Sequence, residues 1–357
     1  MCIQNAPNLL DIKEYPVEQI RQILNKELIV KLSSNENVYG PSPKVLWLTK
    51  EATENLQLYP DPQAFSLKGK LCKLWDIEQE QILIGNGADE VIDLTVRGLL
   101  QEGEEVIIPI PTYDNYRVAV ERWGAICKFV NLRQGNFDLE EIQGAITDKT
   151  KMIFLCNPNN PTGAFISGLA LEKFIEGLPE HVILVLDEAY GEYEYEHVSG
   201  IRYIEKKNVI AIRTFSKIYG LAACRIGYAV ARPFLIEKLD AARLTFNTNS
   251  LGLAAAEASL EDPIHIGKIK YFNEKSKTLM IRQLEKQGIS YFDSSANFLM
   301  IDTGMDSKEI YIRLLEKGIV IEPILHKDYQ SCIRVTLGTD EINDYFLDNL
   351  FNLLHQK

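Results

Sequence analysis

The chain has 357 residues, enough for one large and one smaller hydrophobic core, and its formal net charge is −12, with 38 Lys and Arg against 50 Asp and Glu. The acidic balance and the lack of a basic run argue against nucleic acid as a partner. No apolar stretch is long enough to span a bilayer and no signal-like segment begins the chain, so we expect a cytoplasmic protein without a membrane partner.

Short apolar segments alternate with helical ones between residues 65 and 250. Several of these segments are continuous runs of Val, Ile and Leu, which is typical of strands buried on both faces of a mostly parallel sheet. Helical stretches such as 89–100 lie between them. The pattern predicts an α/β domain in which a mostly parallel sheet is flanked by helices. The predicted strands are QILIG (81–85), EVIIPI (105–110), ICKFVNL (126–132), KMIFLCNP (151–158), VILVLDEAY (182–190), VIAIRTFS (209–216) and IGYAVA (226–231).

The pattern changes after about residue 255. A long polar helix runs to Gly288, a plausible C-cap, and shorter strands and helices follow it. We expect a smaller α+β domain at 256–357, packed with an N-terminal segment at 1–40, and a large domain at 41–255. The later elements are ISYF (289–292), ANFLMI (296–301), a helix at 307–318, CIRVTLG (332–338) and a helix from Asp340.

Polar residues follow several of the strands, at the edge where open α/β sheets bind ligands. After residues 81–85 a Gly-containing turn enters a helix, and the main-chain amides of Ala88 and Asp89 suit a phosphate there. Such turns are more often turns only. The Asn/Pro-rich loop CNPNNPTG (156–163) could hold a polar ring substituent, although a tight connection is the simpler interpretation.

Two further strands end in groups that carry charge. Asp187 closes one apolar run, where a carboxylate is costly unless a cation pairs with it; a helix N-cap is the alternative. Thr214 and Ser216 follow the next strand, and with Arg225 they supply the hydroxyls and guanidinium of a phosphate site. Lys217 lies among them, where apolar surroundings would favour the neutral amine that attacks a carbonyl, although most lysines are only solvated surface residues.

Taken together, these groups are what pyridoxal phosphate (PLP) requires. A carboxylate keeps the ring nitrogen protonated, a lysine carries the aldehyde, and hydroxyls and an arginine hold the phosphate. The six cysteines and five histidines are dispersed without metal-ligand spacing, so we expect no metal site.

The sequence resembles the fold-type I PLP-dependent aminotransferases, most closely the histidinol-phosphate aminotransferases, over nearly its whole length. This resemblance implies that the large domain binds PLP and that the substrates are an amine or amino acid and a 2-oxo acid. The motifs that carry it are SSNENVYGPSP (33–43), YPDP (59–62), GNGADE (85–90), PTYDNY (111–116), NPNNPTG (157–163), DEAY (187–190), RTFSKIYGLAACRIGY (213–228) and IRVTLGT (333–339).

The resemblance also implies a role for each cofactor residue. Lys217 would form the Schiff base and move the proton of the reaction, and Asp187 would pair with the ring nitrogen. Asn160 and Tyr190 would hydrogen-bond the ring oxygen, and Tyr113 would stack on the ring. The phosphate would be bound by Ala88 and Asp89 (main chain), Thr214, Ser216 and Arg225.

Other matched residues point to the substrate and to a partner chain. Arg334 would bind the substrate carboxylate, with Asn35 and Tyr15 near the entrance. Tyr59 would reach the phosphate of the neighbouring subunit's cofactor, which implies a homodimer with shared active sites.

The most serious departure from the family pattern is Glu322 in KGIVIEP (317–323). Histidinol-phosphate aminotransferases usually carry an Arg at the position of Glu322, where it binds the substrate's phosphate. A carboxylate facing that phosphate would oppose it, at on the order of 4 kcal/mol for a pair of like charges about 4 Å apart at an effective dielectric near 20. Alternatively, Glu322 points to solvent and Lys327 or His326 supplies the cation.

Three functions therefore stay open. The first is transamination between L-histidinol phosphate and 2-oxoglutarate. The second is a PLP transaminase, oxidase or decarboxylase that acts on an amino acid with a cationic side chain such as arginine, which Glu322 would attract. The third is a non-catalytic PLP-binding scaffold, which the presence of Lys217, Asp187 and Arg225 makes the least supported.

Overall fold

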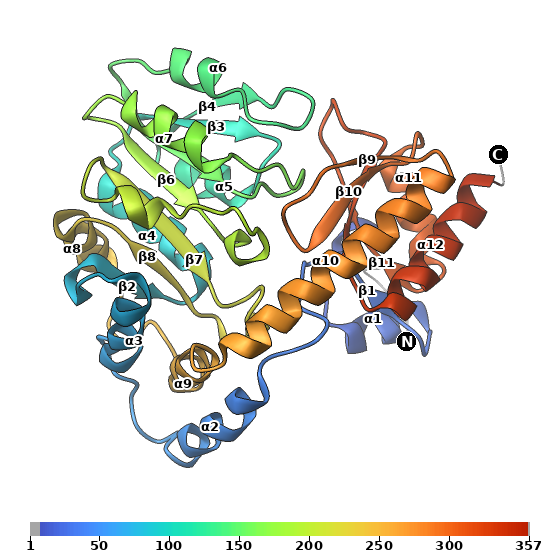
Figure 1. Ribbon diagram of the computed structural model, residues 1–357, viewed down its shortest axis with the longest axis horizontal. Helices are drawn as coiled ribbons and strands as arrows, with labels where there is room; N and C mark the ends of the chain where they lie inside the picture. Colours follow the sequence, from blue (N-terminus) through green and yellow to red (C-terminus); the bar gives the residue numbers. More distant parts are fainter. Residues whose placement is uncertain (1–7, 356–357) are drawn as a thin grey trace. The chain divides into compact units, whose positions relative to one another are not determined.

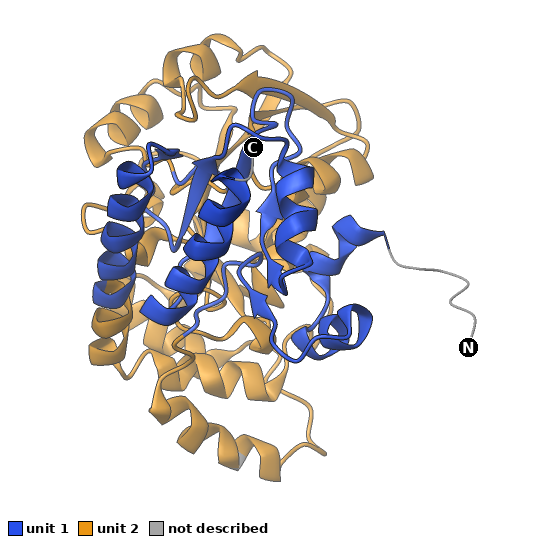
Figure 2. Cartoon of the chain, turned by 90° about the vertical axis from the view of Figure 1, so that its right-hand side faces the viewer, with its two compact units in different colours: residues 1–38, 161–163, 271–357 blue, residues 39–160, 164–270 orange. Residues whose placement is uncertain are grey.

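The computed structural model describes residues 8–355, and its chain forms two compact units (Figures 1 and 2). Unit 1 comprises residues 1–38, 161–163 and 271–357, and unit 2 comprises residues 39–160 and 164–270. The chain passes from unit 2 to unit 1 within helix α10 (Pro263–Lys286), fifteen residues beyond the boundary expected from the sequence. No helix among residues 8–355 has the length and apolar character needed to cross a membrane.

Unit 2 is built on a seven-stranded sheet in the order β2-β8-β7-β6-β5-β3-β4. Strand β8 is antiparallel to both of its neighbours, and the other pairings are parallel. All seven strands predicted from the sequence are confirmed, as is the mostly parallel sheet. Their bounds are β2 (Ile82–Gly85), β3 (Glu105–Ile110), β4 (Ile126–Asn131), β5 (Thr150–Cys156), β6 (Ile183–Asp187), β7 (Val209–Thr214) and β8 (Gly227–Val230).

Burial along the strands follows their place in the sheet. Every residue of β6 and β7 is buried, as expected for continuous apolar runs inside a sheet covered on both faces. Edge strand β4 instead exposes Ile126, Phe129 and Asn131. The main core lies between one face of the sheet and the buried sides of α4 (Gly87–Leu99), α5 (Asn115–Arg122) and α8 (Pro233–Ala242).

The remaining helices of unit 2 surround this sheet or precede it in the chain (Figure 1). Helix α4 begins directly after β2, so that its first turn lies at the carboxyl end of a strand. This geometry places a helix N-terminus at the edge where the predicted site residues gather. The other helices are α2 (Pro43–Glu54), α3 (Phe65–Trp75), α6 (Leu139–Gly144), α7 (Gly168–Glu176) and α9 (Ser250–Ser259).

Unit 1 is α+β, as predicted. Its four-stranded antiparallel sheet has the order β12-β13-β10-β9, and a separate parallel pair joins β1 (Val30–Lys31) to β11 (Ile319–Val320). Apolar residues from the sheet and from its helices form a second core. The other elements are α1 (Val17–Leu24), β9 (Ser290–Phe292), β10 (Phe298–Asp302), α11 (Ser307–Leu315), β12 (Glu322–Pro323), β13 (Cys332–Thr336) and α12 (Asp340–His355).

Candidate active site

A cup of polar groups lies after strand β7. The Thr214 hydroxyl donates to Ser216 Oγ over 3.0 Å and accepts from the Ser216 main-chain N–H at 3.1 Å. Arg225 Nη1 lies 3.4 Å from Ser216 Oγ. The structure therefore brings together the three side chains that the sequence predicts for a phosphate.

The start of helix α4 forms the other wall of this cup. Gly87 has φ +81°, and a Cβ at this position would collide with the guanidinium of Arg225. A Cβ at Gly227 would lie 2.5 Å from the main-chain nitrogen of Ala88. Glycines at both positions thus let the first turn of α4 approach Arg225 and strand β8, and they leave the amide end of a 13-residue helix beside the cup.

The Asp89 side chain has contacts that the sequence did not predict. Its carboxylate accepts from the Tyr113 hydroxyl at 2.7 Å and from Asn115 Nδ2 at 3.0 Å, and it pairs with Arg225 Nη2 at 3.0 Å. A single carboxylate thus joins the aromatic expected to stack on the ring to the arginine expected to bind the phosphate. Phosphate binding by the main-chain amide of Asp89 remains a prediction. Its side chain in addition orients Tyr113 and Arg225.

Asp187 lies at the end of β6 with only 3% of its surface exposed. The sequence led us to expect a cation beside it, but the described contacts of its carboxylate are the Tyr116 hydroxyl, at 2.6 Å, and the Ala189 N–H, at 3.0 Å. Burial raises the pKa of Asp187 to about 6, and these two hydrogen bonds oppose the rise. The buried carboxylate is thus suited to a positively charged group brought by a ligand.

Tyr116, the hydrogen-bond partner of Asp187, is a site residue that the sequence did not predict. It is fully buried, stacks on Phe154 with ring centroids 4.7 Å apart, and has Tyr113 edge-on at 5.6 Å. The available signal was its place as the last residue of the motif PTYDNY (111–116).

Lys217 and Tyr190 lie close to each other. The Lys217 ammonium is 5.6 Å from the centroid of the Tyr190 ring, within the range of a cation–π contact. Tyr190 is buried, and so is Asn160, at the end of the loop that follows β5. All the predicted cofactor residues, Tyr59 included, belong to unit 2.

The predicted substrate residues all belong to unit 1. Arg334 in β13 is 8% exposed and donates from Nη2 to the carbonyl of Ser33. Asn35 is 1% exposed, adopts φ +56°, and donates its main-chain N–H to Thr336 Oγ1 at 3.0 Å. Tyr15 is half-buried and packs against the second core.

Glu322 is paired with a cation that the sequence analysis did not consider. Its carboxylate accepts from Lys13 of the 3₁₀ helix η1 (Leu9–Glu14), and its other oxygen lies 3.9 Å from Arg334 Nη2. Glu322 and Arg334 are direct cross-strand partners in β12 and β13. Because the Glu322 side chain is 20% exposed and ion-paired, the interpretation that it points to solvent is wrong.

Lys327 and His326 are the cations that the sequence offers for the substrate's phosphate, and this role stays a prediction. Burial lowers the pKa of His326, whose Nδ1 lies 3.8 Å from Asp328. The cation beside Glu322 comes from Lys13, about 310 residues away in the chain. With Lys13, Glu322 and Arg334 ionised, the three groups sum to one positive charge.

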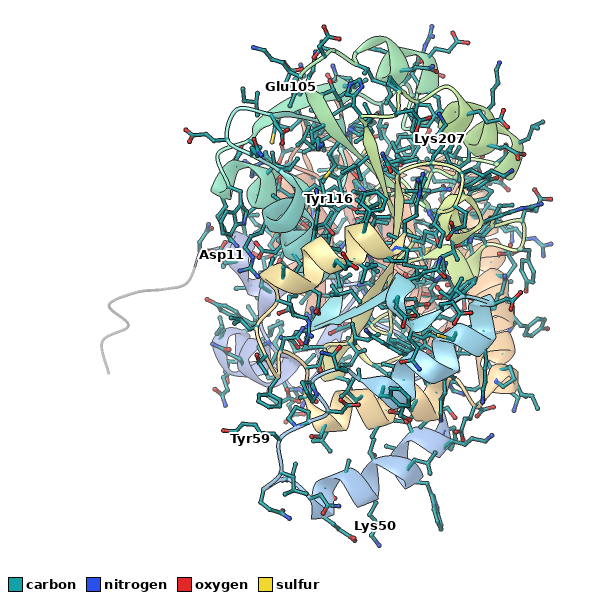
Figure 3. The ribbon with its side chains drawn as sticks, turned by 90° about the vertical axis from the view of Figure 1, so that its left-hand side faces the viewer. Asp11, Lys50, Tyr59, Glu105, Tyr116 and Lys207 are labelled. Carbon is teal, nitrogen blue, oxygen red and sulfur yellow. The ribbon has the colours of Figure 1, made fainter. Side chains whose placement is uncertain are left out.

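Tyr59 is 81% exposed, and its ring stacks on Phe246 at 4.7 Å (Figure 3). This aromatic side chain thus lies at the surface of unit 2.

Known proteins resemble this chain in sequence. Residues 27–350 match the family described as Aminotransferase class I and II. The chain belongs to this family. Histidinol-phosphate aminotransferases are among its relatives: that of Moorella thermoacetica is 38% identical over 97% of this chain and 92% of its own, and that of Caldicellulosiruptor saccharolyticus is 38% identical over 95% and 96%.

A solved structure agrees with this assignment. The histidinol-phosphate aminotransferase of Sinorhizobium meliloti, crystallised with pyridoxal-5'-phosphate, superposes with a TM-score of 0.91 at 29% identity, over 96% of this chain and 95% of that chain. The present chain is a PLP-dependent aminotransferase of fold type I.

The site residues of this aminotransferase fit the cofactor. A buried carboxylate at Asp187 suits a protonated ring nitrogen, and the hydroxyl and guanidinium groups around Ser216 suit a phosphate dianion. No cluster of three or more His, Cys, Asp or Glu side chains within residues 8–355 is arranged to hold a metal ion.

Proposed function

We propose that this aminotransferase transfers an amino group between L-histidinol phosphate and 2-oxoglutarate. The observation that carries the proposal is the 38% identity to histidinol-phosphate aminotransferases along 97% of the chain. A cytoplasmic location remains a prediction from the sequence.

The residues of unit 2 divide the cofactor chemistry among them. PLP, when bound, supplies an electron sink for negative charge at the substrate's Cα. The ε-amino group of Lys217 would hold the aldehyde carbon, and it would carry the proton between the substrate's Cα and the cofactor's C4′. Asp187, ionised above about pH 6, holds the ring nitrogen in its protonated form. Asn160 and Tyr190 orient the ring through its oxygen.

The phosphate anchor keeps the ring in place while the amine exchanges. The amides of Ala88 and Asp89, the hydroxyls of Thr214 and Ser216, and the guanidinium of Arg225 supply donors from a helix N-terminus and a strand end. Tyr113, held through Asp89, stacks on the ring and limits its tilt.

The substrate's anionic group is assigned to Arg334, with Asn35 and Tyr15 beside the entrance. Lys13 removes the electrostatic objection to a phosphate, because the charge of Glu322 is matched by Lys13 and the cluster retains a net positive charge. A cationic substrate would have to displace Lys13 from Glu322, so the arginine-like alternative gains no support from this arrangement.

A single-turnover panel tests the substrate assignment. PLP-loaded protein is mixed separately with histidinol phosphate, arginine, phosphothreonine, phenylalanine and glutamate, and conversion of the bound cofactor to its amine form is followed by absorbance. We expect rapid conversion with histidinol phosphate and with glutamate. Conversion by arginine but not by histidinol phosphate would overturn the proposal.

Arg225 provides a test of the phosphate anchor. Arg225→Met removes a charge-assisted hydrogen bond, which is worth about 1.5–3 kcal/mol, so we expect the Kd for PLP to rise about 10- to 100-fold. Equilibrium dialysis of the holoenzyme measures this constant. Arg202→Met, at an exposed arginine of the same unit, is the matched control and should leave it unchanged.

The proposed assembly is a homodimer in which Tyr59 meets the neighbouring subunit's cofactor phosphate. Large apolar side chains are exposed on helix α2 and in the segment that follows it, and this supports the proposal because exposed apolar surface marks interfaces. They are Leu46, Trp47, Leu48, Leu56, Leu58 and Tyr59.

Sedimentation velocity tests the dimer. Two chains of 40.6 kDa should sediment together as a species of about 81 kDa. Trp47→Asp, at a side chain 84% exposed, should shift the protein toward monomer, and Leu169→Asp, at a leucine 81% exposed on α7, should not. A monomeric holoenzyme at micromolar concentration would contradict the shared-site assembly.

A further inference from the structure

The sheet of unit 2 presents different residues on its two faces where β6 and β7 end. Asp187 and Ile212 are register partners, and side chains alternate between faces along a strand. The next residues, Glu188 and Arg213, therefore lie on the face opposite Asp187. The hydrogen bonding between β6 and β7 extends to Glu188, because its N–H donates to the Ile212 carbonyl at 2.8 Å.

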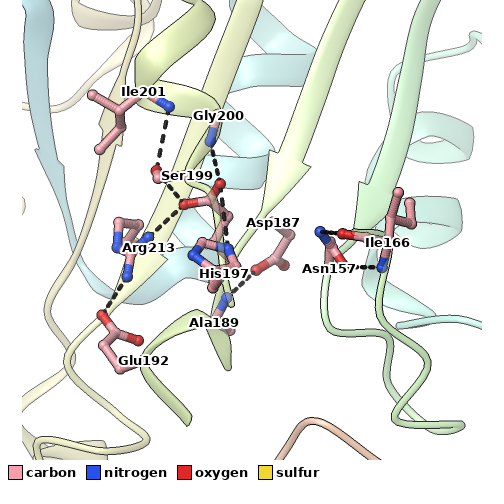
Figure 4. Close-up of polar contacts among 11 residues, drawn as sticks. Asn157, Ile166, Asp187, Ala189, Glu192, His197, Ser199, Gly200, Ile201 and Arg213 are labelled. Carbon is pink, nitrogen blue, oxygen red and sulfur yellow. Dashed lines mark hydrogen bonds and ion pairs between the residues drawn. The ribbon is translucent and has the colours of Figure 1, made fainter. Parts of the chain in front are cut away.

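The Glu188 carboxylate is 1% exposed and fully engaged on this opposite face. It accepts from the Ser199 hydroxyl at 2.7 Å, from the Gly200 N–H at 2.5 Å and from Arg213 Nη1 (Figure 4). Arg213 belongs to β7, and Ser199 and Gly200 belong to the segment after Tyr193. The carboxylate therefore links the end of β6 to both of these parts of the chain.

Arg213 is equally constrained. It is 2% exposed, donates from Nη2 to Glu192 at 2.7 Å, and its guanidinium carbon lies 4.7 Å from the centroid of the Trp75 ring. His197 faces Glu188 at 3.7 Å, but burial lowers the pKa of His197 and favours its neutral form. Arg213 thus holds one positive charge between two carboxylates.

Stability alone is a weak explanation for such a pair. Removing two charges from water costs several kcal/mol per ion, and buried ion pairs are often no more stabilising than apolar residues of similar volume. Their directional bonds do, however, restrict where the backbone lies. Here the restricted backbone carries Asp187 one residue before Glu188 and Thr214 one residue after Arg213.

We propose that Glu188 is a positioning residue for the cofactor. Through its pair with Arg213 it fixes the carboxyl ends of β6 and β7 relative to each other. Asp187 and Thr214, on the opposite face, then keep the spacing that a ring nitrogen and a phosphate on one rigid ligand require. The inference rests on the proposed assignment of Asp187 and Thr214 to the cofactor and extends it to the residues behind them.

Four variants of the holoenzyme test this role. Glu188→Gln keeps the shape and removes the charge, Ser199→Ala removes one hydrogen bond, and Arg213→Lys keeps the charge but loses the forked geometry. Glu196→Gln is the matched control, because Glu196 is an exposed glutamate in the same loop. The measurements are the Kd for PLP by equilibrium dialysis, the pH midpoint of the bound cofactor's visible absorbance, and the melting temperature.

We expect Glu188→Gln to raise the Kd for PLP at least tenfold and to lower the absorbance midpoint, because loss of a nearby negative charge weakens proton binding. Ser199→Ala and Arg213→Lys should raise the Kd about threefold or more, and Glu196→Gln should change neither quantity. If Glu188→Gln changes only the melting temperature, the role is structural and the proposal is wrong.

If Glu188→Gln does not fold, Ser199→Ala and Arg213→Lys test the proposal in its place. Wild-type Kd and midpoint in both Ser199→Ala and Arg213→Lys would overturn the proposal, and a raised Kd in either would support it. No amine substrate enters these measurements, so they are independent of the assignment to histidinol phosphate.

Discussion

Asp187→Asn is expected to stabilise the cofactor-free protein by about 3 kcal/mol at pH 8 while lowering turnover of the holoenzyme on the order of 10²- to 10³-fold. Burial raises the pKa of Asp187 from its ordinary value of 3.8 to about 6, so ionising this carboxyl is costlier in the folded protein than in the unfolded chain. Asparagine has no charge to bury, and it still accepts from Tyr116. It cannot hold a protonated ring nitrogen by charge, which is why activity falls.

The sign of the pH dependence follows from proton binding. Between pH 3.8 and about 6 the folded state of the wild type binds more protons at Asp187 than the unfolded state, so this residue's contribution to stability declines as the pH rises through that window. The difference of about 2.2 pKa units corresponds to about 3 kcal/mol. The advantage of Asp187→Asn should therefore be small near pH 4 and complete above about pH 7.

Urea unfolding of the cofactor-free wild type and variant at pH 4, 6 and 8 measures this effect. Asp148→Asn, at an exposed carboxyl, is the control and should show no comparable gain. Equal stability of wild type and Asp187→Asn at pH 8 would show that a cation already compensates the Asp187 carboxylate in the folded protein.

Lys13→Met should lower kcat/KM for histidinol phosphate more than tenfold, because it leaves Glu322 without its lysine beside Arg334. It should also cost about 1–3 kcal/mol of stability, since the broken pair is largely but not fully buried. Glu322→Gln should act in the opposite direction on histidinol phosphate. Each prediction follows from the net charge of Lys13, Glu322 and Arg334, which is +1 in the wild type, 0 after the first change and +2 after the second.

The double variant Lys13→Met/Glu322→Gln restores a net charge of +1 and serves as the control. Its kcat/KM for histidinol phosphate should return to within a few-fold of the wild type. The differences among the four proteins should shrink as salt is added, because ions screen partly exposed charges. Unchanged kinetics in Lys13→Met would place the substrate's phosphate away from this cluster and would remove the support that Lys13 lends to the proposed function.

The strand-end motifs predicted a cofactor site before the structure because each motif lies in one short segment. Thr214 is the last residue of β7, and Ser216 and Lys217 follow it within three residues. Parallel strands bring such segments to one edge. Asp187 was recognisable because burying a carboxylate at the end of a strand costs free energy unless a partner compensates its charge. Its actual partner, Tyr116, comes from a helix about 70 residues earlier, which local patterns do not specify.

The sequence alone determined the family and the α/β class with its seven strands, and it predicted a set of residues that would hold PLP, because periodicity and motif spacing are local properties. Only the tertiary structure decided which groups meet across long stretches of chain. It paired Lys13 with Glu322 and aligned Glu188 with Arg213 behind the site. Those contacts depend on strand register and packing, and they set the charge at Arg334 and the spacing between Asp187 and Thr214.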